Sequence, residues 1–163
     1  MRLVVQRVLE SSVSVDGELK ASIGKGVNVL VGIDRYDTSE EAEYCARKLV
    51  NLKLWNGPDK TWAKSVKDLG LEVLLVSQFT LMANLKKGYK PDFHVAMKND
   101  TSRDFFDDFV ALVRKMLTAE QVKIGCFGEH MDVAIRNDGP VTIVMDTIEL
   151  RGSPQKPSSP VSP

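Results

Sequence analysis

The chain has 163 residues, of which 43% are hydrophobic and 27% are charged, a composition typical of one soluble folded domain with a real core. Lysine plus arginine and aspartate plus glutamate number 22 each, so net charge predicts no nucleic-acid partner, although a local basic patch can still supply one. With no signal-peptide pattern, no apolar run near the roughly 18 residues of a membrane span, and two distant cysteines, the sequence predicts a cytoplasmic protein with free thiols.

The first third of the sequence predicts three strands. Residues 2–15 carry apolar side chains on both faces, and Asp16-Gly17 is a strong hairpin turn into a return strand over residues 19–23. Residues 27–33 are short, apolar and β-branched, as expected for a buried strand.

A helix is predicted next. Thr38 and Glu41 have the spacing of a capping box, and apolar residues at helical spacing follow over residues 42–52, so one helix face should be buried. The polar stretch at residues 59–68 contains Trp62, which we expect to be its single apolar anchor.

Residues 71–76 form the most apolar run, and we predict a central strand there. It ends in the polar segment 77–81, and a long basic loop follows over residues 82–100; loops of this length in compact domains are usually functional or mobile. A second helix, starting near Thr101 or Ser102, has a continuous apolar stripe, which indicates core rather than a cofactor site.

The last third predicts short strands at residues 122–125, 131–135 and 141–145. Between the last two lies the segment 137–142, NDGPVT, which we interpret as a hairpin turn. Pro140 has no N–H to donate, so it should lie at a sheet edge or begin a strand. The alternative is a binding device, because a glycine followed by a proline can present two bare carbonyls, and a cis bond would aim them unusually.

The predicted domain covers residues 1–151. Residues 152–163 contain four prolines and should form a disordered tail. The element order indicates the α/β class, of the α+β type, with two helices covering one mixed sheet.

No strong catalytic or metal-binding motif is present. His94 and His130 lie 36 residues apart with no paired ligands, so no metal site is predicted. Ser77 has no recognisable histidine and aspartate partners. The polar strand end at Ser77, Gln78 and Thr80 remains a candidate site, with an ordinary strand end as the alternative.

Several segments taken together are more specific. SQFTL at 77–81 and NDGPVT at 137–142 form a specific pair, and the chain resembles the D-aminoacyl-tRNA deacylase (D-tyrosyl-tRNA deacylase) family from residue 1 to about residue 150. Four further segments carry the resemblance: MRLVVQRV at the start, NLKLWN at 51–56, KGYKPDF at 87–93 and GCFGEHM at 125–131.

The resemblance implies a mixed, mainly antiparallel sheet, curved like a barrel, with two long helices, and a homodimer whose active sites are shared between subunits. It also implies a cytoplasmic hydrolase without a cofactor that cleaves the ester between a D-amino acid and tRNA. Glycine, including glycine mischarged on tRNA-Ala, should be accepted, whereas L-aminoacyl-tRNA should be rejected. Such proofreading keeps translation homochiral.

The resemblance also assigns roles to residues. A cis Gly139-Pro140 dipeptide, braced by Arg7 and flanked by Asn137 and Thr142, should enter the active site of the partner subunit and exclude L side chains. Phe127 and Met131 correspond to the pocket for the terminal adenine. The wall around the scissile carbonyl corresponds to Ser77, Gln78, Phe79 and Thr80.

Catalysis in the family is thought to need no protein nucleophile. Backbone N–H groups near Phe79 or Thr80 could stabilise the oxyanion, and the 2′-hydroxyl of the tRNA is the expected participant in activating water. Thr80 as a nucleophile is the alternative, which no accompanying base supports.

The lysines of the basic loop are the candidates for tRNA binding. We expect Lys86, Lys87 and Lys90 to contact phosphates, the alternative being an ordinary solvated loop. A second hypothesis is a non-catalytic nucleic-acid-binding protein, because some eukaryotic relatives are linked to DNA-replication origins through C-terminal extensions. The tail here offers only Lys156 after Arg151 for DNA contacts.

Overall fold

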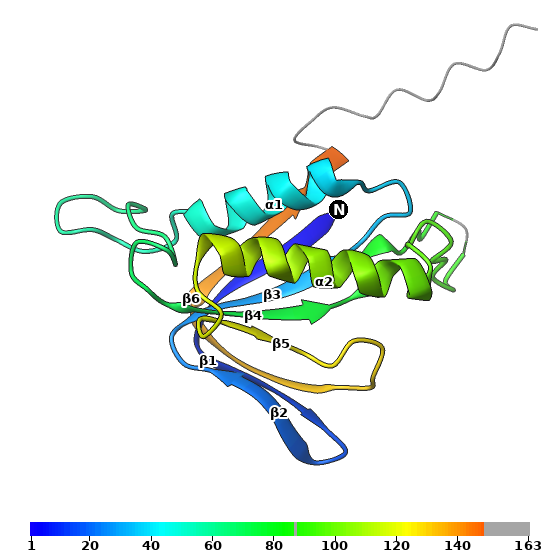
Figure 1. Ribbon diagram of the computed structural model, residues 1–163, viewed down its shortest axis with the longest axis horizontal. Coiled ribbons are helices and arrows are strands. Elements are labelled where there is room, and N and C mark those ends of the chain that lie inside the picture. The colour runs from blue at the N-terminus through cyan, green and yellow to red at the C-terminus, as the bar shows by residue number, and fades with distance from the viewer. Residues whose placement is uncertain (87, 149–163) are drawn as a thin grey trace, which may run out of the picture.

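The computed structural model describes residues 1–86 and 88–148 (Figure 1). The predictions for Lys87 and for the tail at 152–163 lie outside the described residues. The elements in chain order are β1 (Arg2–Val15), β2 (Glu18–Ile23), β3 (Gly26–Gly32), α1 (Ser39–Asn51), β4 (Glu72–Ser77), the 3-10 turn η1 (Phe79–Met82), α2 (Asn99–Met116), β5 (Val122–Ile124) and β6 (Asp132–Asp146).

The six strands form one mixed sheet in which β1 pairs with three other strands. Strand β1 pairs antiparallel with β2, β3 and β6, whereas β3, β4 and β5 are parallel neighbours. Strand β2 returns to contact β4 and β5, so the sheet curls into a nearly closed barrel. Helices α1 and α2 lie side by side on one outer face (Figure 1). The predicted α+β class, with a mainly antiparallel curved sheet and two long helices, is therefore confirmed.

Apolar packing occurs on both faces of this sheet. One cluster joins the helices to the sheet, with Leu49, Phe106 and Phe109 fully enclosed. A smaller cluster fills the inside of the curled sheet and includes Val13 and Leu74. The two-sided burial explains why residues 2–15 carry apolar side chains on both faces.

The C-terminal strand corrects one prediction: residues 132–146 form one continuous strand, and no hairpin turn lies at 137–142. Both halves of β6 pair with β1. Between the pairs Gln6–Thr142 and Val8–Asn137, β1 contributes one residue and β6 contributes four. The extra residues leave the ladder as a bulge, which absorbs the Asp-Gly-Pro sequence without reversing the chain.

Two apolar positions also differ from expectation. Trp62 is 54% exposed, so it does not anchor its segment; the buried tryptophan is Trp55, at 6%. Helix α2 begins at Asn99, slightly earlier than predicted, and it buries Phe106 more fully than Phe105. The capping box of Thr38 and Glu41 is confirmed. Among the described residues, no helix is long and apolar enough to cross a membrane.

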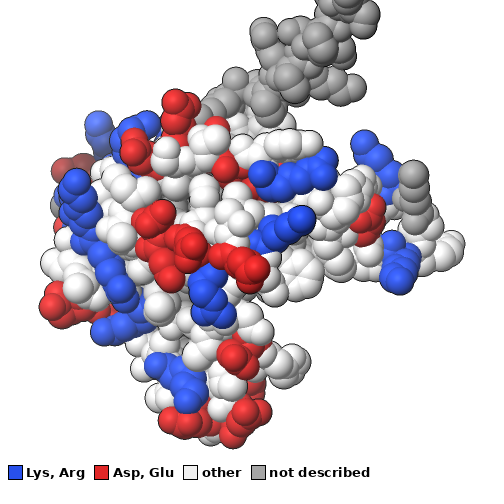
Figure 2. All heavy atoms as spheres, turned by 45° about the vertical axis from the view of Figure 1, so that its right-hand side comes forward, with Lys and Arg blue, Asp and Glu red and all other residues white. Residues whose placement is uncertain are grey.

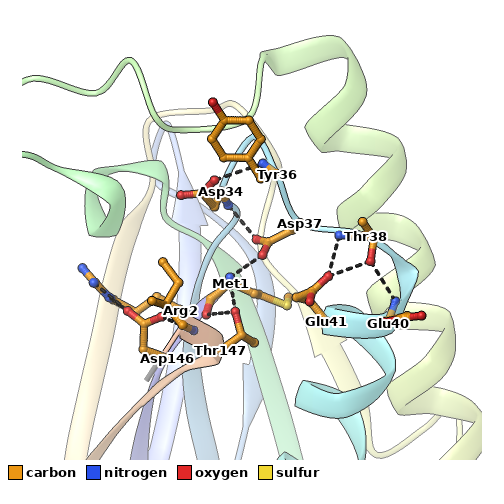
Figure 3. A network of polar contacts seen from close by, with 11 residues as sticks. Met1, Arg2, Asp34, Tyr36, Asp37, Thr38, Glu40, Glu41, Asp146 and Thr147 are labelled. Atoms are coloured by element: carbon orange, nitrogen blue, oxygen red, sulfur yellow. Dashed lines mark hydrogen bonds and ion pairs between the residues drawn. The ribbon is translucent and has the colours of Figure 1, made fainter. Parts of the chain in front are cut away.

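The first residues of the chain join three distant segments (Figure 3). The Met1 ammonium donates to Asp37 before α1 and, at 2.8 Å, to the hydroxyl of Thr147. Arg2 pairs with Asp146 at the end of β6. These contacts fix the first residue of β1 to the last residue of β6.

Candidate active site

A cavity of about 390 Å³ opens at the carboxyl ends of β3 and β4. Because these strands are parallel neighbours, their ends meet at one edge of the sheet, where sites commonly form. Val31 and Ser77 line the cavity from the strands, and Ser102 lines it from the first turn of α2. The loop after β5 closes the far side with residues 127–131.

The turn η1 forms the cavity wall next to β4. Its entry is fixed because the Gln78 amide donates to the Val31 carbonyl at 2.8 Å. The first N–H groups of a helical turn have no hydrogen-bond acceptor within that turn. The Phe79 N–H, the first of η1, therefore has no acceptor inside the turn. The Phe79 ring is 58% exposed and meets Phe93 edge-on at 5.1 Å.

Three of the four predicted wall residues line the cavity: Ser77, Gln78 and Phe79. Thr80 does not belong to the lining. Its hydroxyl accepts a hydrogen bond of 2.6 Å from Nε2 of Gln78, which holds the amide side chain at the cavity rim. The structure therefore brings Thr80 next to the site through Gln78.

Phe127 and Met131, the residues expected at an adenine pocket, line the opposite side of the same cavity. The Phe127 ring lies against Phe106, with centroids 5.6 Å apart, and beneath the guanidinium of Arg103 at 4.8 Å. Arg103 also donates to the Phe127 carbonyl at 3.2 Å. At Gly125 an added Cβ would lie 2.9 Å from the Met131 sulfur, so this glycine lets Met131 pack closely.

Arg103 and Ser102 were not found from the sequence. Both lie in the first turns of α2, where the sequence shows a mixture of polar and charged residues typical of a solvated helix face. No local signal distinguishes an arginine that stacks on a distant phenylalanine from one that points into water.

The Gly139-Pro140 segment lies outside this cavity. Its peptide bond is cis, as the resemblance implies, and both residues are exposed on the bulge of β6. Asn137 and Thr142, also exposed, are the paired residues that border the bulge. The structure does not bring these four residues to the cavity within this chain.

Arg7 is placed against the bulge, as expected for a bracing residue. Its Nε donates to the Asp138 carbonyl at 3.1 Å and lies 3.3 Å from the Asp138 carboxylate. A second guanidinium nitrogen donates to the Leu54 carbonyl at 2.5 Å. One arginine thus ties the bulge of β6 to the segment after α1.

Lys86 and Lys90 are exposed on the loop after η1. Two backbone hydrogen bonds of 2.7 and 3.1 Å between Asn84 and Asp92 close the base of this loop. Basic side chains with an acidic group between them lie at the right of Figure 2, and charges of both signs are interspersed over the rest of that face. Among the residues that the structure describes, no three His, Cys, Asp or Glu side chains form a metal-binding group.

Comparison with known proteins gives consistent results. The profile of the family described as D-Tyr-tRNA(Tyr) deacylase matches residues 4–146. The chain is 47% identical to a D-aminoacyl-tRNA deacylase of Dictyostelium discoideum, covering 91% of this chain and 99% of that one. It is 47% identical to D-aminoacyl-tRNA deacylase 1 of Homo sapiens, covering 90% and 70%. A solved structure described as c-Myc DNA Unwinding Element Binding Protein superposes with a TM-score of 0.87 and 46% identity, covering 90% and 99%.

Proposed function

The chain belongs to the D-Tyr-tRNA(Tyr) deacylase family and is a hydrolase acting on ester bonds, and from this premise we propose that it removes D-amino acids from tRNA as a proofreading enzyme of cytoplasmic translation. The observation that carries the proposal is the cavity wall itself. The family match spans residues 4–146, and within it Ser77, Gln78 and Phe79 meet Phe127 and Met131 around one cavity.

In the proposed reaction, water attacks the ester carbonyl carbon, and the bond from that carbon to the ribose oxygen breaks. The Phe79 amide, at the start of η1, stabilises the negative charge that develops on the carbonyl oxygen. The 2′-hydroxyl of the terminal ribose takes part in activating the water. The protein contributes mainly position, because an aminoacyl ester is already labile.

Thr80 has a supporting role in this proposal. Its hydroxyl accepts a hydrogen bond from Gln78 and lies outside the cavity lining, so it orients the amide rather than attacking the ester. We expect Thr80→Ala to retain activity within about tenfold of the wild type, the effect of losing about one hydrogen bond. Complete loss of hydrolysis with substrate binding intact would instead identify Thr80 as the nucleophile.

Selection against L-amino acids is assigned to Gly139 and Pro140, acting in the cavity of a second subunit. Their exposure on the edge strand β6, outside the cavity of their own chain, supports a cross-subunit role in a homodimer. Arg7 donates a hydrogen bond to the carbonyl of Asp138, the residue before Gly139. Asn137 and Thr142 fix the ends of the bulge. The bare carbonyls occupy the space of an L side chain, so D-aminoacyl and glycyl esters, including glycyl-tRNA-Ala, are accepted.

The rest of the tRNA end is held by two further groups. The terminal adenine packs against the Phe127 ring and contacts Met131. Phosphates are contacted by Lys86, Lys87 and Lys90, which suits an enzyme that must accept many tRNA sequences.

The direct test is hydrolysis of D-tyrosyl-tRNA, L-tyrosyl-tRNA and glycyl-tRNA-Ala by the full chain. We expect rapid loss of the D-tyrosyl and glycyl esters and survival of the L-tyrosyl ester. A D-ester that remained intact at micromolar enzyme would refute the proposal. Sedimentation of the same preparation should show a dimer.

A second candidate function is DNA binding. It is favoured by the name of the similar solved structure, which refers to a DNA unwinding element. The face shown in Figure 2 carries both charge signs, which gives a weak field for duplex DNA on that face. Competition between duplex DNA and tRNA that carries no amino acid distinguishes the two functions. Tighter binding of the DNA would support the DNA-binding function.

A further inference from the structure

Arg2, the first residue of β1, makes three polar contacts with one guanidinium group. Its Nε donates to a carboxylate oxygen of Asp146 at 2.8 Å, and a terminal nitrogen lies 2.6 Å from the same oxygen (Figure 3). The other terminal nitrogen donates to the carbonyl of Leu81 at 2.7 Å. The Asp146 side chain is only 6% exposed, so it holds the arginine in a fixed orientation.

Leu81 belongs to η1, the turn that lines the cavity. The entry of this turn is held by the hydrogen bond from the Gln78 amide to Val31. Its exit is held by Arg2 through the Leu81 carbonyl. The two bonds lie on either side of the Phe79 amide, so the orientation of that amide depends on both.

The opposite side of the turn rests on Gly32. A Cβ at Gly32 would lie 2.8 Å from the Cβ of Leu81 and 3.0 Å from the end of Met82. Gly32 is also the residue that pairs with Arg2 across β1 and β3. The turn therefore packs against Gly32 on one side and is hydrogen-bonded by Arg2, the β1 residue paired with Gly32.

The end of the turn borders an open space. An open cavity of about 730 Å³ lies there, lined by Arg2, Met82, Asp146 and residues 83–86. Side chains leave this volume open toward solvent, although Met82 at the end of the turn is itself buried. A turn that loses its bond to Arg2 has room to move away from the active-site cavity.

We propose that Arg2, oriented by Asp146, is a positioning residue for catalysis: it holds η1 so that the Phe79 amide faces the scissile carbonyl. The inference rests on the proposed function, and it assigns Arg2 no contact with substrate. Arg7, on the same strand, holds the Gly139-Pro140 bulge instead. In this proposal Arg2 positions the turn η1, and Arg7 positions the Gly139-Pro140 bulge. Loss of Arg2 therefore lowers the rate of hydrolysis without changing the preference for D-aminoacyl over L-aminoacyl esters.

The test uses Arg2→Gln and Arg2→Lys in the full chain. Large residues are chosen because a small second residue would permit removal of Met1, whose ammonium pairs with Asp37. We expect Arg2→Gln to lower kcat on D-tyrosyl-tRNA about tenfold with KM within about twofold, since small displacements of catalytic groups have effects of this size or larger. Arg2→Lys, which keeps the charge but not the fork, should fall between this variant and the wild type.

Two further variants separate positioning from general stability. Gly32→Ala pushes the same turn from the opposite side and should reproduce the fall in kcat. Arg47→Ala removes an exposed side chain of α1 whose guanidinium lies 5.9 Å from the Tyr44 ring, and it should leave kcat unchanged. Unchanged kcat in a folded Arg2→Gln protein, or a fall that disappears once rates are divided by the folded fraction, would overturn the proposal.

Amide hydrogen exchange gives a readout that does not need activity. The Leu81 and Ala83 amides donate within the turn, to Gln78 and Thr80. Both should exchange faster in Arg2→Gln than in the wild type, while the amides of α1 should not change; equal exchange at Leu81 and Ala83 would overturn the proposal. If the wild-type enzyme failed to cleave the D-ester, the proposed function would fail, but the exchange result would still decide whether Arg2 positions η1.

Discussion

Gly139 has a backbone conformation that only glycine adopts easily, with φ at +132°. An added Cβ would lie 2.9 Å from the Val141 nitrogen and 3.0 Å from a methyl group of the same valine. We expect Gly139→Ala to introduce about 1–3 kcal/mol of local strain and to displace the neighbouring carbonyls. The ratio of D-tyrosyl-tRNA to L-tyrosyl-tRNA hydrolysis should fall at least about tenfold, measured with a folded protein.

Gly17→Ala is the matched control for this substitution. Gly17 also has a positive φ, +80°, but nothing lies within 4 Å of its Cβ position. The variant should lose some stability and keep its D/L ratio. If Gly139→Ala also kept the ratio, the bulge would not be the chiral filter.

Arg103 is a second residue whose contacts define a measurable effect. It stacks on Phe127 and donates to the Phe127 carbonyl, interactions worth about 1–2 kcal/mol together. Arg103→Ala should therefore lower kcat/KM for D-tyrosyl-tRNA about 5- to 30-fold, mainly through KM, because the Phe127 ring, proposed to contact the terminal adenine, loosens. Arg47→Ala, which removes a guanidinium 5.9 Å from the Tyr44 ring, should have no such effect.

Among single residues, five of the predicted site residues line one cavity in the structure: Ser77, Gln78 and Phe79, with Phe127 and Met131. These positions were accessible because they follow apolar runs or belong to recognisable motifs. Arg2 and Arg103 were not accessible in this way. Their partners, Leu81 and Phe127, are distant in sequence, and a charged residue near the start of a strand or helix has no pattern that announces a long-range contact.

At the scale of elements, the main difference concerns β6. The Asp-Gly-Pro sequence predicted a turn from local preference, but both flanking runs find the same partner, β1, and the extra residues become a bulge. Hydrogen bonding with β1 along both halves outweighs the local tendency to reverse direction. The strands at residues 2–15, 19–23 and 71–76 were predictable because their boundaries carry local turn signals.

The segment between α1 and β4 is held by Asp68. Its carboxylate accepts hydrogen bonds from the Lys53 ammonium at 2.6 Å and the Ser65 amide at 2.8 Å. The Lys53 bond, and then the Ser65 bonds, lower the pKa of Asp68 well below its ordinary value of 3.8. A carboxyl group with a lowered folded-state pKa stabilises the fold above its ordinary pKa, and this contribution is lost as pH falls through the folded-state value.

Asp68→Asn should therefore be less stable than the wild type at neutral pH, and the difference should shrink as pH falls below about 4. Urea unfolding between pH 2 and pH 7 would measure it. Lys53→Met should remove only part of the pH dependence, because the Ser65 amide still donates to the Asp68 carboxylate. A stability difference independent of pH would show that the Asp68 charge is not involved.

At the scale of the whole molecule, balanced charge is compatible with tRNA binding only if a few basic residues contact phosphates. We expect Lys86→Gln with Lys90→Gln to raise KM for D-tyrosyl-tRNA and to reduce the slope of log(1/KM) against log salt by about 1.4–1.8, for two lost phosphate contacts. Lys60→Gln with Lys67→Gln changes net charge equally on another exposed surface and should leave the slope unchanged. An unaltered slope in the first pair would remove this loop from the RNA contact surface.

The bulge of β6 has a further consequence for the molecule as a monomer. In the described chain β6 pairs only with β1, so its other edge offers unpaired backbone groups over 15 residues, the kind of edge that templates aggregation. Residues 138–141 leave the ladder, and Pro140 has no N–H to donate. The edge is thereby divided into two pieces, residues 132–137 and 142–146. We therefore expect this interruption to disfavour continuous edge-to-edge pairing of β6 with a foreign strand.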